Sequence, residues 1–345
     1  MKLSTHIFLI ISILLVISLE EAKSQQVPRF SQFILNEFII NPAAAGSDGR
    51  TTATLVGRKE WLGFENGVPT PESYCLSFQT RFLKRRLSVK SNNSGNKLMK
   101  RSNGRVGLGA NIINDYNGAM QRLGIGATYA YHLRLNESQL SFGLTASITQ
   151  LQVRSKYLSF KDNSNETMLA LANASIWIPD VAVGINYMYR RFRAGFAAAQ
   201  LLESSVIWGN SSLNLSNANI HFRRNYFLHA AYCNRFNNTQ WEYEPSALLK
   251  FNDPVNLNAN YNGAKIQADM LLRLIYDQSY WFGGGYRTSN EFILMGGLKF
   301  KNIYFTYSFD YGSNGITRYS YGSHEISISA KFGDSARRYL WEDRY

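Results

Sequence analysis

Residues 303–311 read IYFTYSFDY, and residues 323–332 read SHEISISAKF. Large apolar residues occupy every second position in both stretches, and polar residues fill most of the positions between them. Successive side chains of a β-strand point to opposite faces, so each stretch predicts a strand with one apolar and one polar face. In the first stretch the apolar set is Ile303, Phe305, Tyr307, Phe309 and Tyr311, and the polar set includes Thr306, Ser308 and Asp310.

The same alternation recurs along the chain in segments that are long for a soluble protein. Strands of a soluble sandwich average about 5–6 residues, whereas a tilted strand needs about 9–11 residues to cross a bilayer. The length of these segments therefore predicts an all-β fold, a transmembrane antiparallel β-barrel of about 14 strands within residues 51–332. The expected strands are 51–61, 72–82, 104–114, 121–134, 138–152, 180–190, 192–199, 224–236, 240–251, 265–276, 279–288, 291–301, 302–311 and 322–332.

The connections between these strands alternate in length. Bacterial barrels have short periplasmic turns, long outer loops and an even number of strands. Both termini are therefore expected in the periplasm, including a tail at 333–345. The short connections are 135–137, 191, 237–239, 277–278 and the step from 301 to 302; the long ones are 153–179, 200–223, 252–264 and 312–321.

The N-terminus predicts export. Lys2 precedes an apolar run from Ile7 to Leu19, and Ala22-Lys23-Ser24 has the pattern of a cleavage site. Residues 1–24 are therefore expected to be a signal peptide, and the mature chain to begin at Gln25. The formal net charge is +13, but export makes nucleic acid an improbable partner. Outer-membrane lipid, peptidoglycan or an acidic protein fits this charge better.

Residues that could carry chemistry are few, and no catalytic, cofactor or metal site is expected. Ser323-His324-Glu325 has the composition of a catalytic triad. Neighbouring residues of a strand point to opposite faces, however, so His324 and Glu325 cannot act together as a relay. No Cys and His spacing suits zinc, and no glycine-rich loop leads into a helix.

Residues 25–50 precede the first strand and are rich in apolar side chains, including Phe30 and Phe33. Such residues are not expected to remain in water. Two interpretations stay open: a strand or short helix that covers the periplasmic mouth of the barrel, and a plug or docking element.

The connection at 83–103 breaks the pattern of short periplasmic turns. The stretch from Leu83 to Arg105 carries eight basic residues and no acidic one. A solvated loop is the usual meaning of such a run, and docking to an anionic partner is the alternative. We hypothesise that this turn and the segment 25–50 form one periplasmic docking surface, with Phe30 and Phe33 buried against the partner. The basic residues chosen to test this are Lys84, Arg85, Arg86, Lys100 and Arg101.

Three groups of residues near the N-terminus together resemble the start of the PorP/SprF proteins of type IX secretion. The closing strand resembles the last strand of that family. These residues are Pro28, Phe30, Ser31, Gln32, Phe33 and Asn36; Asn41, Pro42, Ala43 and Gly46; Arg58, Trp61, Gly63 and Phe64; and His324, Glu325 and Phe332 at the barrel closure.

The resemblance implies an outer-membrane component that assists the secretion and cell-surface attachment of adhesin-type cargo, including adhesins used in gliding. It implies partners of two kinds: cargo with a C-terminal sorting domain, and periplasmic peptidoglycan-associated or lipoprotein components of the machinery. A passive porin or small-molecule transporter is the alternative function, and it requires an open lumen. An outer-membrane hydrolase would need a Ser/His pair on one face of the barrel, and the sequence offers none.

Overall fold

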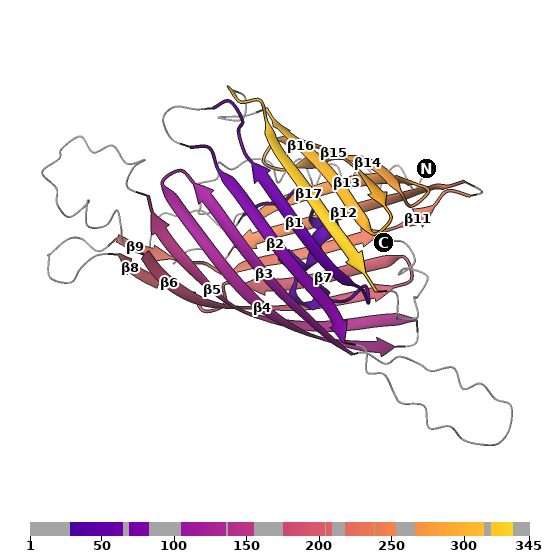
Figure 1. The fold of residues 1–345 in the computed structure, drawn as a ribbon, viewed down its shortest axis with the longest axis horizontal. Helices are drawn as coiled ribbons and strands as arrows, with labels where there is room; N and C mark the ends of the chain where they lie inside the picture. Colours follow the sequence, from indigo (N-terminus) through magenta and orange to yellow (C-terminus); the bar gives the residue numbers. More distant parts are fainter. Residues whose placement is uncertain are drawn as a thin grey trace, which may run out of the picture.

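The computed structural model describes residues 28–64, 69–82, 105–135, 137–154, 175–203, 205–208, 218–237, 239–252, 266–313 and 319–333. Fourteen strands in this part of the chain form one closed antiparallel barrel (Figure 1). They are β1 (Thr51–Lys59), β2 (Glu72–Phe82), β3 (Val106–Asn117), β4 (Met120–Leu135), β5 (Ser138–Val153), β6 (Ser175–Tyr189), β7 (Phe192–Ala199), β10 (Asn225–Tyr232), β12 (Trp241–Asn252), β13 (Ile266–Tyr276), β14 (Tyr280–Arg287), β15 (Glu291–Phe300), β16 (Ile303–Gly312) and β17 (Ser323–Phe332).

The first and last strands close the barrel. β1 pairs with β17 from Thr51 opposite Phe332 to Lys59 opposite His324. Three further short strands complete the sheet structure: β11 (Asn234–Arg235) pairs with β12, and β8 (Ser205–Trp208) pairs with β9 (Ala218–His221) outside the barrel. The closed ring leaves no unpaired edge along the barrel wall, as a bilayer requires of a spanning sheet.

The two ends of the barrel differ in their connections. At the end where β1 begins and β17 finishes, β4–β5, β6–β7, β13–β14 and β15–β16 are joined by tight turns; we call this end the turn mouth. At the opposite end, long segments join β5–β6, β7–β10, β12–β13 and β16–β17; we call it the loop mouth. No helix in the described ranges is long and apolar enough to cross a membrane.

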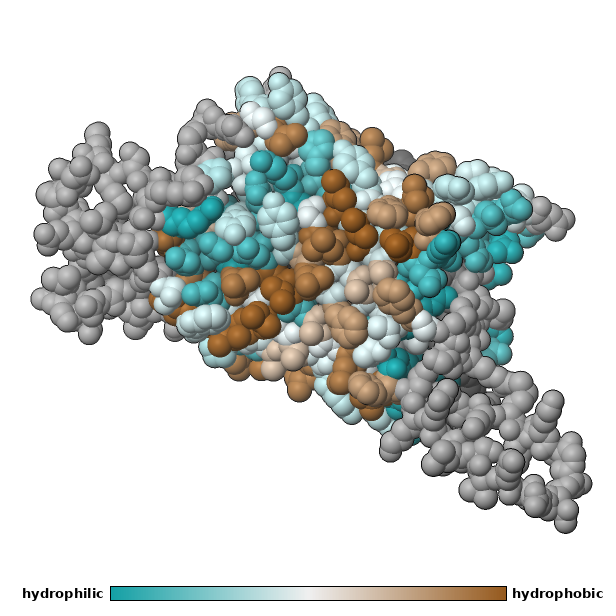
Figure 2. Space-filling view, viewed as in Figure 1, coloured by the Kyte–Doolittle hydropathy of each residue, from teal (hydrophilic) through white to brown (hydrophobic). Residues whose placement is uncertain are grey.

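The strands face as the alternation predicts. Ile303, Phe305 and Tyr307 are exposed on the outer wall, while Thr306 and Ser308 are buried toward the lumen. Figure 2 shows apolar side chains gathered over the middle of the visible wall, with hydrophilic ones toward its two ends. This band is the surface that meets lipid, and the free cysteines Cys75 and Cys233 are buried away from it.

One strand boundary differs from the sequence expectation in an instructive way. β6 begins at Ser175 rather than at residue 180, and Pro179 lies within it opposite Ile148. Proline usually ends a strand because it cannot donate to the ladder. On its other side β6 pairs with β7 only from Val183 onward, so Pro179 lies where β6 extends beyond β7 and interrupts no ladder between these two strands.

Candidate functional site

Residues 28–50 lie inside the barrel, and we call them the plug. They contain three short helical turns: η1 (Phe33–Asn36), α2 (Glu37–Ile40) and η2 (Pro42–Ala44). Ser31, Asn41 and Ala45 are 0% exposed, and most of their neighbours are also buried. Of the two interpretations of the segment 25–50, the geometry favours the plug, because the chain occupies the lumen rather than covering the mouth.

A cluster of charged lumen residues holds the start of the plug. The Glu325 carboxylate accepts hydrogen bonds from the backbone N–H groups of Ser31 at 2.7 Å and Gln32 at 3.2 Å. The Ser31 hydroxyl donates to Asp310 at 2.5 Å. It accepts from Arg58 at 2.8 Å and from Arg287 at 3.2 Å. We call Ser31, Arg58, Arg287, Asp310 and Glu325 the plug anchor.

The anchor is an ionic network buried from solvent. Arg58 pairs with Asp310 at 2.8 Å and with Glu325 at 3.2 Å, and all three side chains are 1–2% exposed. Arg287 pairs with Asp310 at 3.2 Å. Charge-assisted hydrogen bonds of this kind are stronger than neutral ones. Loss of Arg58 would remove the arginine that pairs with the buried Glu325 and leave Arg287 as the ion-pair partner of Asp310, so the anchor fixes one position of the plug.

A second group of ion pairs lies next to the anchor, on the side of the loop mouth. Arg29 pairs with Glu60 at 3.1 Å and with Glu291 at 3.5 Å. Burial alone would raise the pKa of Glu60, which follows the last residue of β1, but Arg29 and Arg58 outweigh burial and lower this pKa to about 2. Glu60 therefore stays charged through the physiological pH range.

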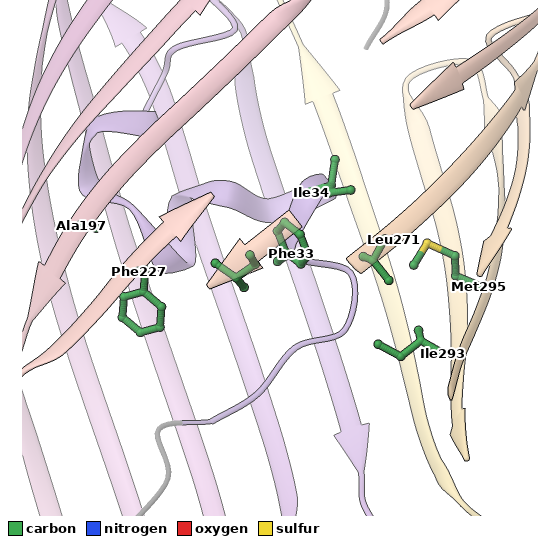
Figure 3. Close-up of a cluster of buried hydrophobic side chains, with 8 residues drawn as sticks. Phe33, Ile34, Ala197, Phe227, Leu271, Ile293 and Met295 are labelled. Carbon is green, nitrogen blue, oxygen red and sulfur yellow. The ribbon is translucent and has the colours of Figure 1, made fainter. Parts of the chain in front are cut away.

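The middle of the plug packs against an apolar cluster. Figure 3 shows Phe33 and Ile34 beside Phe227, Leu271 and Ile293, which come from β10, β13 and β15. Burying apolar surface contributes roughly 25 cal/mol per Å² removed from water. The plug is thus held by packing as well as by charge.

The end of the plug is fitted to glycines of the barrel wall. A Cβ built on Gly143 would lie 2.2 Å from backbone atoms of Pro42 and Ala43, and one on Gly107 would lie 2.1 Å from the carbonyl oxygen of Ala45. His132 reaches the same carbonyl with Nε2 at 3.0 Å. Only glycine lets the plug backbone approach the strands this closely.

The plug runs through the lumen from one mouth to the other. Arg29 contacts Glu60 and Glu291 at the loop mouth, whereas Thr51 begins β1 at the turn mouth beside Phe332. The described ends of the chain, residues 28 and 333, therefore lie at opposite mouths. The sequence offered no sign that the first segment threads the barrel. The termini themselves lie outside the described residues, so the expectation that both share one side stays a prediction.

The structure brings the parts of the family signature together. Pro28, Phe30, Ser31, Gln32, Phe33, Asn36, Asn41, Pro42, Ala43 and Gly46 belong to the plug, and Arg58 belongs to its anchor. The segment with Trp61, Gly63 and Phe64 lies against the chain before β17 at the loop mouth. There Leu62 N–H donates to the Gly322 carbonyl at 2.9 Å, and Tyr321 N–H donates to the Leu62 carbonyl at 2.7 Å.

His324 and Glu325 point apart, as strand geometry requires. His324 Nδ1 lies 2.7 Å from the Tyr307 hydroxyl on the outer wall, whereas Glu325 is 1% exposed in the lumen. Phe332 is 52% exposed at the end of β17. His324 and Glu325 therefore act in different surroundings, and Glu325 serves the plug.

The docking hypothesis needs revision for the aromatic residues. Phe30 is 8% and Phe33 is 3% exposed, so neither side chain offers a surface to a partner while the plug is in place. Lys84, Arg85, Arg86, Lys100 and Arg101 lie outside the described residues, as do the signal peptide and the tail beyond Gly333. Phe82 and Arg105, which flank the basic turn, lie at the turn mouth.

Several residues of the site were missed by the sequence reasoning. Arg287 and Glu291 complete the ionic network around the anchor. Gly107, Gly143 and Gly184 form the cradle for the end of the plug. Glycines that recur on the lumen side of neighbouring strands were the available signal, since nothing on an empty lumen wall would require them.

Comparison with solved structures finds outer-membrane barrels at low sequence identity. One is the CymD monoaromatic hydrocarbon channel (12% identity, TM-score 0.48, 90% of this chain and 95% of that chain covered). Another is a Pseudomonas aeruginosa FadL homologue (11%, 0.45, 89% and 94%). The Acinetobacter baumannii outer membrane protein Omp33 also matches (8%, 0.42, 83% and 100%). No curated protein matches the chain.

The family comparison covers most of the chain. The model of the type IX secretion system membrane protein PorP/SprF matches residues 22–330. This range contains the plug, its anchor and nearly all of the barrel. The family and the barrel fold together place the protein in the bacterial outer membrane. The chain belongs to the PorP/SprF family of type IX secretion system membrane proteins.

Proposed function

We propose that this outer-membrane component of type IX secretion assists the secretion of adhesin-type cargo and its attachment to the cell surface, including adhesins used in gliding. Family membership supports the secretion role. The filled lumen is the observation that favours this role over a passive porin: residues 28–50 occupy the path that a diffusing solute would take. Cargo with a C-terminal sorting domain would therefore meet the mouths and outer wall rather than pass through the lumen.

Periplasmic partners are proposed to bind at the turn mouth. Short turns usually face the periplasm, so the basic turn with Lys84, Arg85 and Arg86 would leave the barrel on that side. Its charge suits an anionic partner such as a peptidoglycan-associated or lipoprotein component of the machinery. At physiological salt, attraction between exposed charges is screened beyond about 8 Å. These charges are therefore expected to adjust the affinity for the partner and not to provide most of it.

The test is display of cargo by a strain that lacks this protein. Complementation with the wild-type chain is expected to restore a surface adhesin with a C-terminal sorting domain. Replacement of Lys84, Arg85, Arg86, Lys100 and Arg101 with Ser is expected to weaken capture of the periplasmic partner most at low salt, where these charges are least screened. Unchanged surface adhesin in the deletion strain, measured by antibody on intact cells, would show that this protein has no part in its display.

The threaded plug leads to a prediction about the N-terminus. If the mature chain begins at Gln25, three residues precede Pro28, and they span at most roughly 11 Å. This is well short of the hydrocarbon core of about 30 Å. With the turn mouth in the periplasm, the mature N-terminus is expected at the cell surface, and the tail in the periplasm.

An epitope inserted after Gln26 is therefore expected to bind antibody on intact cells. The matched control is the same epitope after Tyr345, which should become accessible only after lysis. If the N-terminal epitope stays hidden on intact cells and appears after lysis, either the orientation or the cleavage site is wrong.

A further inference from the structure

A recess opens at the side of the plug near the turn mouth. It lies between Leu35 of η1 and strands β13, β14, β16 and β17. Its enclosed part measures about 20 Å³, and the whole recess with its open side about 440 Å³. A water molecule needs only about 10–15 Å³ by the first measure. One small group can therefore be enclosed, while the rest of a ligand extends into the open side.

Two buried polar groups that line this recess have no hydrogen-bond partner among the described residues. They are Nε1 of Trp281, which is 6% exposed, and Oγ1 of Thr306, which is 5% exposed. An unsatisfied buried polar group costs about 1–3 kcal/mol. Two such groups in one recess indicate a place that a ligand or water completes.

Three of the polar groups that line the recess can only donate hydrogen bonds, whereas Gln278, Tyr304, Thr306 and Ser329 can also accept them. The Trp281 indole N–H can only donate, and the Lys331 ammonium and the Arg273 guanidinium carry no acceptor. Thr306 can donate through its hydroxyl. A ligand that satisfies this set must accept hydrogen bonds.

The local charge also favours an anion. Asp48 is the carboxylate that attracts Lys331, with 4.0 Å between the charged atoms. Arg50, Arg193 and Arg273 are positively charged neighbours that repel the Lys331 ammonium. Arg273 pairs with Glu244, and Arg193 pairs with Glu37 and Glu244, so the charges of these two arginines are compensated, and Arg50 is the remaining positive neighbour of Lys331.

One part of the recess wall is apolar. Leu35 packs with Ile275, Trp281 and Tyr304 in one buried cluster. The Trp281 and Tyr304 rings lie 6.1 Å apart between centroids at an interplanar angle of 40°. This wall suits the carbon part of a ligand whose charged end lies at Trp281, Thr306 and Lys331.

We propose that this recess binds a carboxylate group attached to a small apolar body. The donors Trp281 and Thr306 and the Lys331 ammonium receive the carboxylate, and the wall formed by Leu35, Ile275 and Tyr304 receives the apolar part. Because Leu35 belongs to the plug, the site is complete only when the plug is in place. A bound ligand therefore stabilises the plugged state relative to a state in which the plug has moved.

Two sources could supply the carboxylate. One is a free organic acid that reaches the turn mouth. The other is this chain, because residues 333–345 follow Phe332, the neighbour of Lys331, and contain Asp334, Glu342 and Asp343. The chemistry of recognition is the same for both.

The experiment measures binding of benzoate to the full-length protein in detergent. The readouts are the intrinsic fluorescence of the protein and the midpoint of its thermal unfolding, and chloride at equal ionic strength is the reference. Saturable binding is expected. Trp281→Phe and Thr306→Val each remove one hydrogen-bond donor and largely keep the shape of the side chain. Each is expected to weaken the affinity for benzoate at least tenfold. Trp177→Phe is the matched control, because Trp177 is 52% exposed on β6, and it should leave the affinity unchanged.

A chain that ends at Gly333 separates the two sources. If the tail occupies the site, its removal tightens benzoate binding; if a free acid is the ligand, removal leaves the affinity unchanged. Both results support the proposal. Absence of saturable binding in both chains, or equal affinity in wild type, Trp281→Phe and Thr306→Val, overturns it.

Discussion

Replacing Arg58 with Met is expected to lower the free energy of unfolding by about 3–5 kcal/mol, the usual cost of removing one partner from a buried ionic network. Arg58 contacts Ser31, Asp310, Glu325 and Glu60 within 3.2 Å. Methionine fills a similar length but supplies no charge and no donor. Asp310 would keep only Arg287 as a counter-charge at 3.2 Å, and Glu325 only the backbone N–H groups of the plug.

The measurement is a denaturant titration of the barrel in detergent or lipid vesicles. Arg58→Lys is expected to recover part of the loss, because lysine restores the charge but not the planar fork that reaches several acceptors at once. Arg190→Met is the control: Arg190 pairs with Glu137 at 2.7 Å, but both side chains are more than half exposed. An equal shift in the midpoints of Arg58→Met and Arg190→Met would contradict the structural role of the anchor.

The pH dependence follows from the lowered pKa of Glu60. A carboxyl whose pKa is lower in the folded state adds stability above its unfolded pKa, and this stability disappears as the pH falls through the folded value. For Glu60 that window runs from the ordinary value of 4.5 down to about 2. Arg58 is one of the two residues that lower this pKa, so the difference between wild type and Arg58→Met is expected to narrow as the pH falls through the window.

The barrel could be predicted from the sequence because its cause is local. Alternation along 303–311 depends only on which side chains face lipid, and the structure places Phe305 outward and Ser308 inward as that rule requires. Strand number follows from counting such segments. The tight turns at 277–279 and 301–302 then divide the connections into two sides.

The plug could not be predicted in the same way because its contacts are not local. Ser31 and Glu325 are 294 residues apart in sequence, and no periodic pattern connects them. The apolar residues Phe30 and Phe33 showed that the segment must be buried, but not whether in a partner or in the lumen. The position of Glu325 on the polar face was predictable, whereas its use as an acceptor for the backbone of the plug depends on the threaded path.

Replacing Gly143 with Val is expected to displace the end of the plug and open the lumen. Gly143 lies on β5 beneath η2, and a Cβ there would lie 2.2 Å from backbone atoms of Pro42 and Ala43. Backbone atoms cannot rotate away as the end of a flexible side chain can, so the plug must shift as a whole. Valine suits the strand itself, and the barrel is therefore expected to assemble.

The measurement is single-channel conductance in a planar bilayer, with heat-modifiable migration on a gel as the check that the barrel has formed. Wild type is expected to show no open-channel steps, and Gly143→Val to show discrete ones. The matched control is Gly296→Val. Gly296 lies between the exposed residues Phe282 and Tyr307, and its Cβ would approach nothing closer than 3.7 Å.

Three outcomes separate the functions considered for this barrel. If Gly143→Val conducts and Gly296→Val does not, the lumen is closed by a plug that fits one side of its wall, and a passive porin role is excluded for the wild-type state. If the assembled Gly143→Val barrel stays sealed, contacts other than η2 close the lumen, and the anchor around Arg58 becomes the element to remove next. If wild type already conducts at the level of Gly143→Val, the residues at 28–50 do not block the path, and a passive porin role is favoured over cargo handling at the mouths and outer wall.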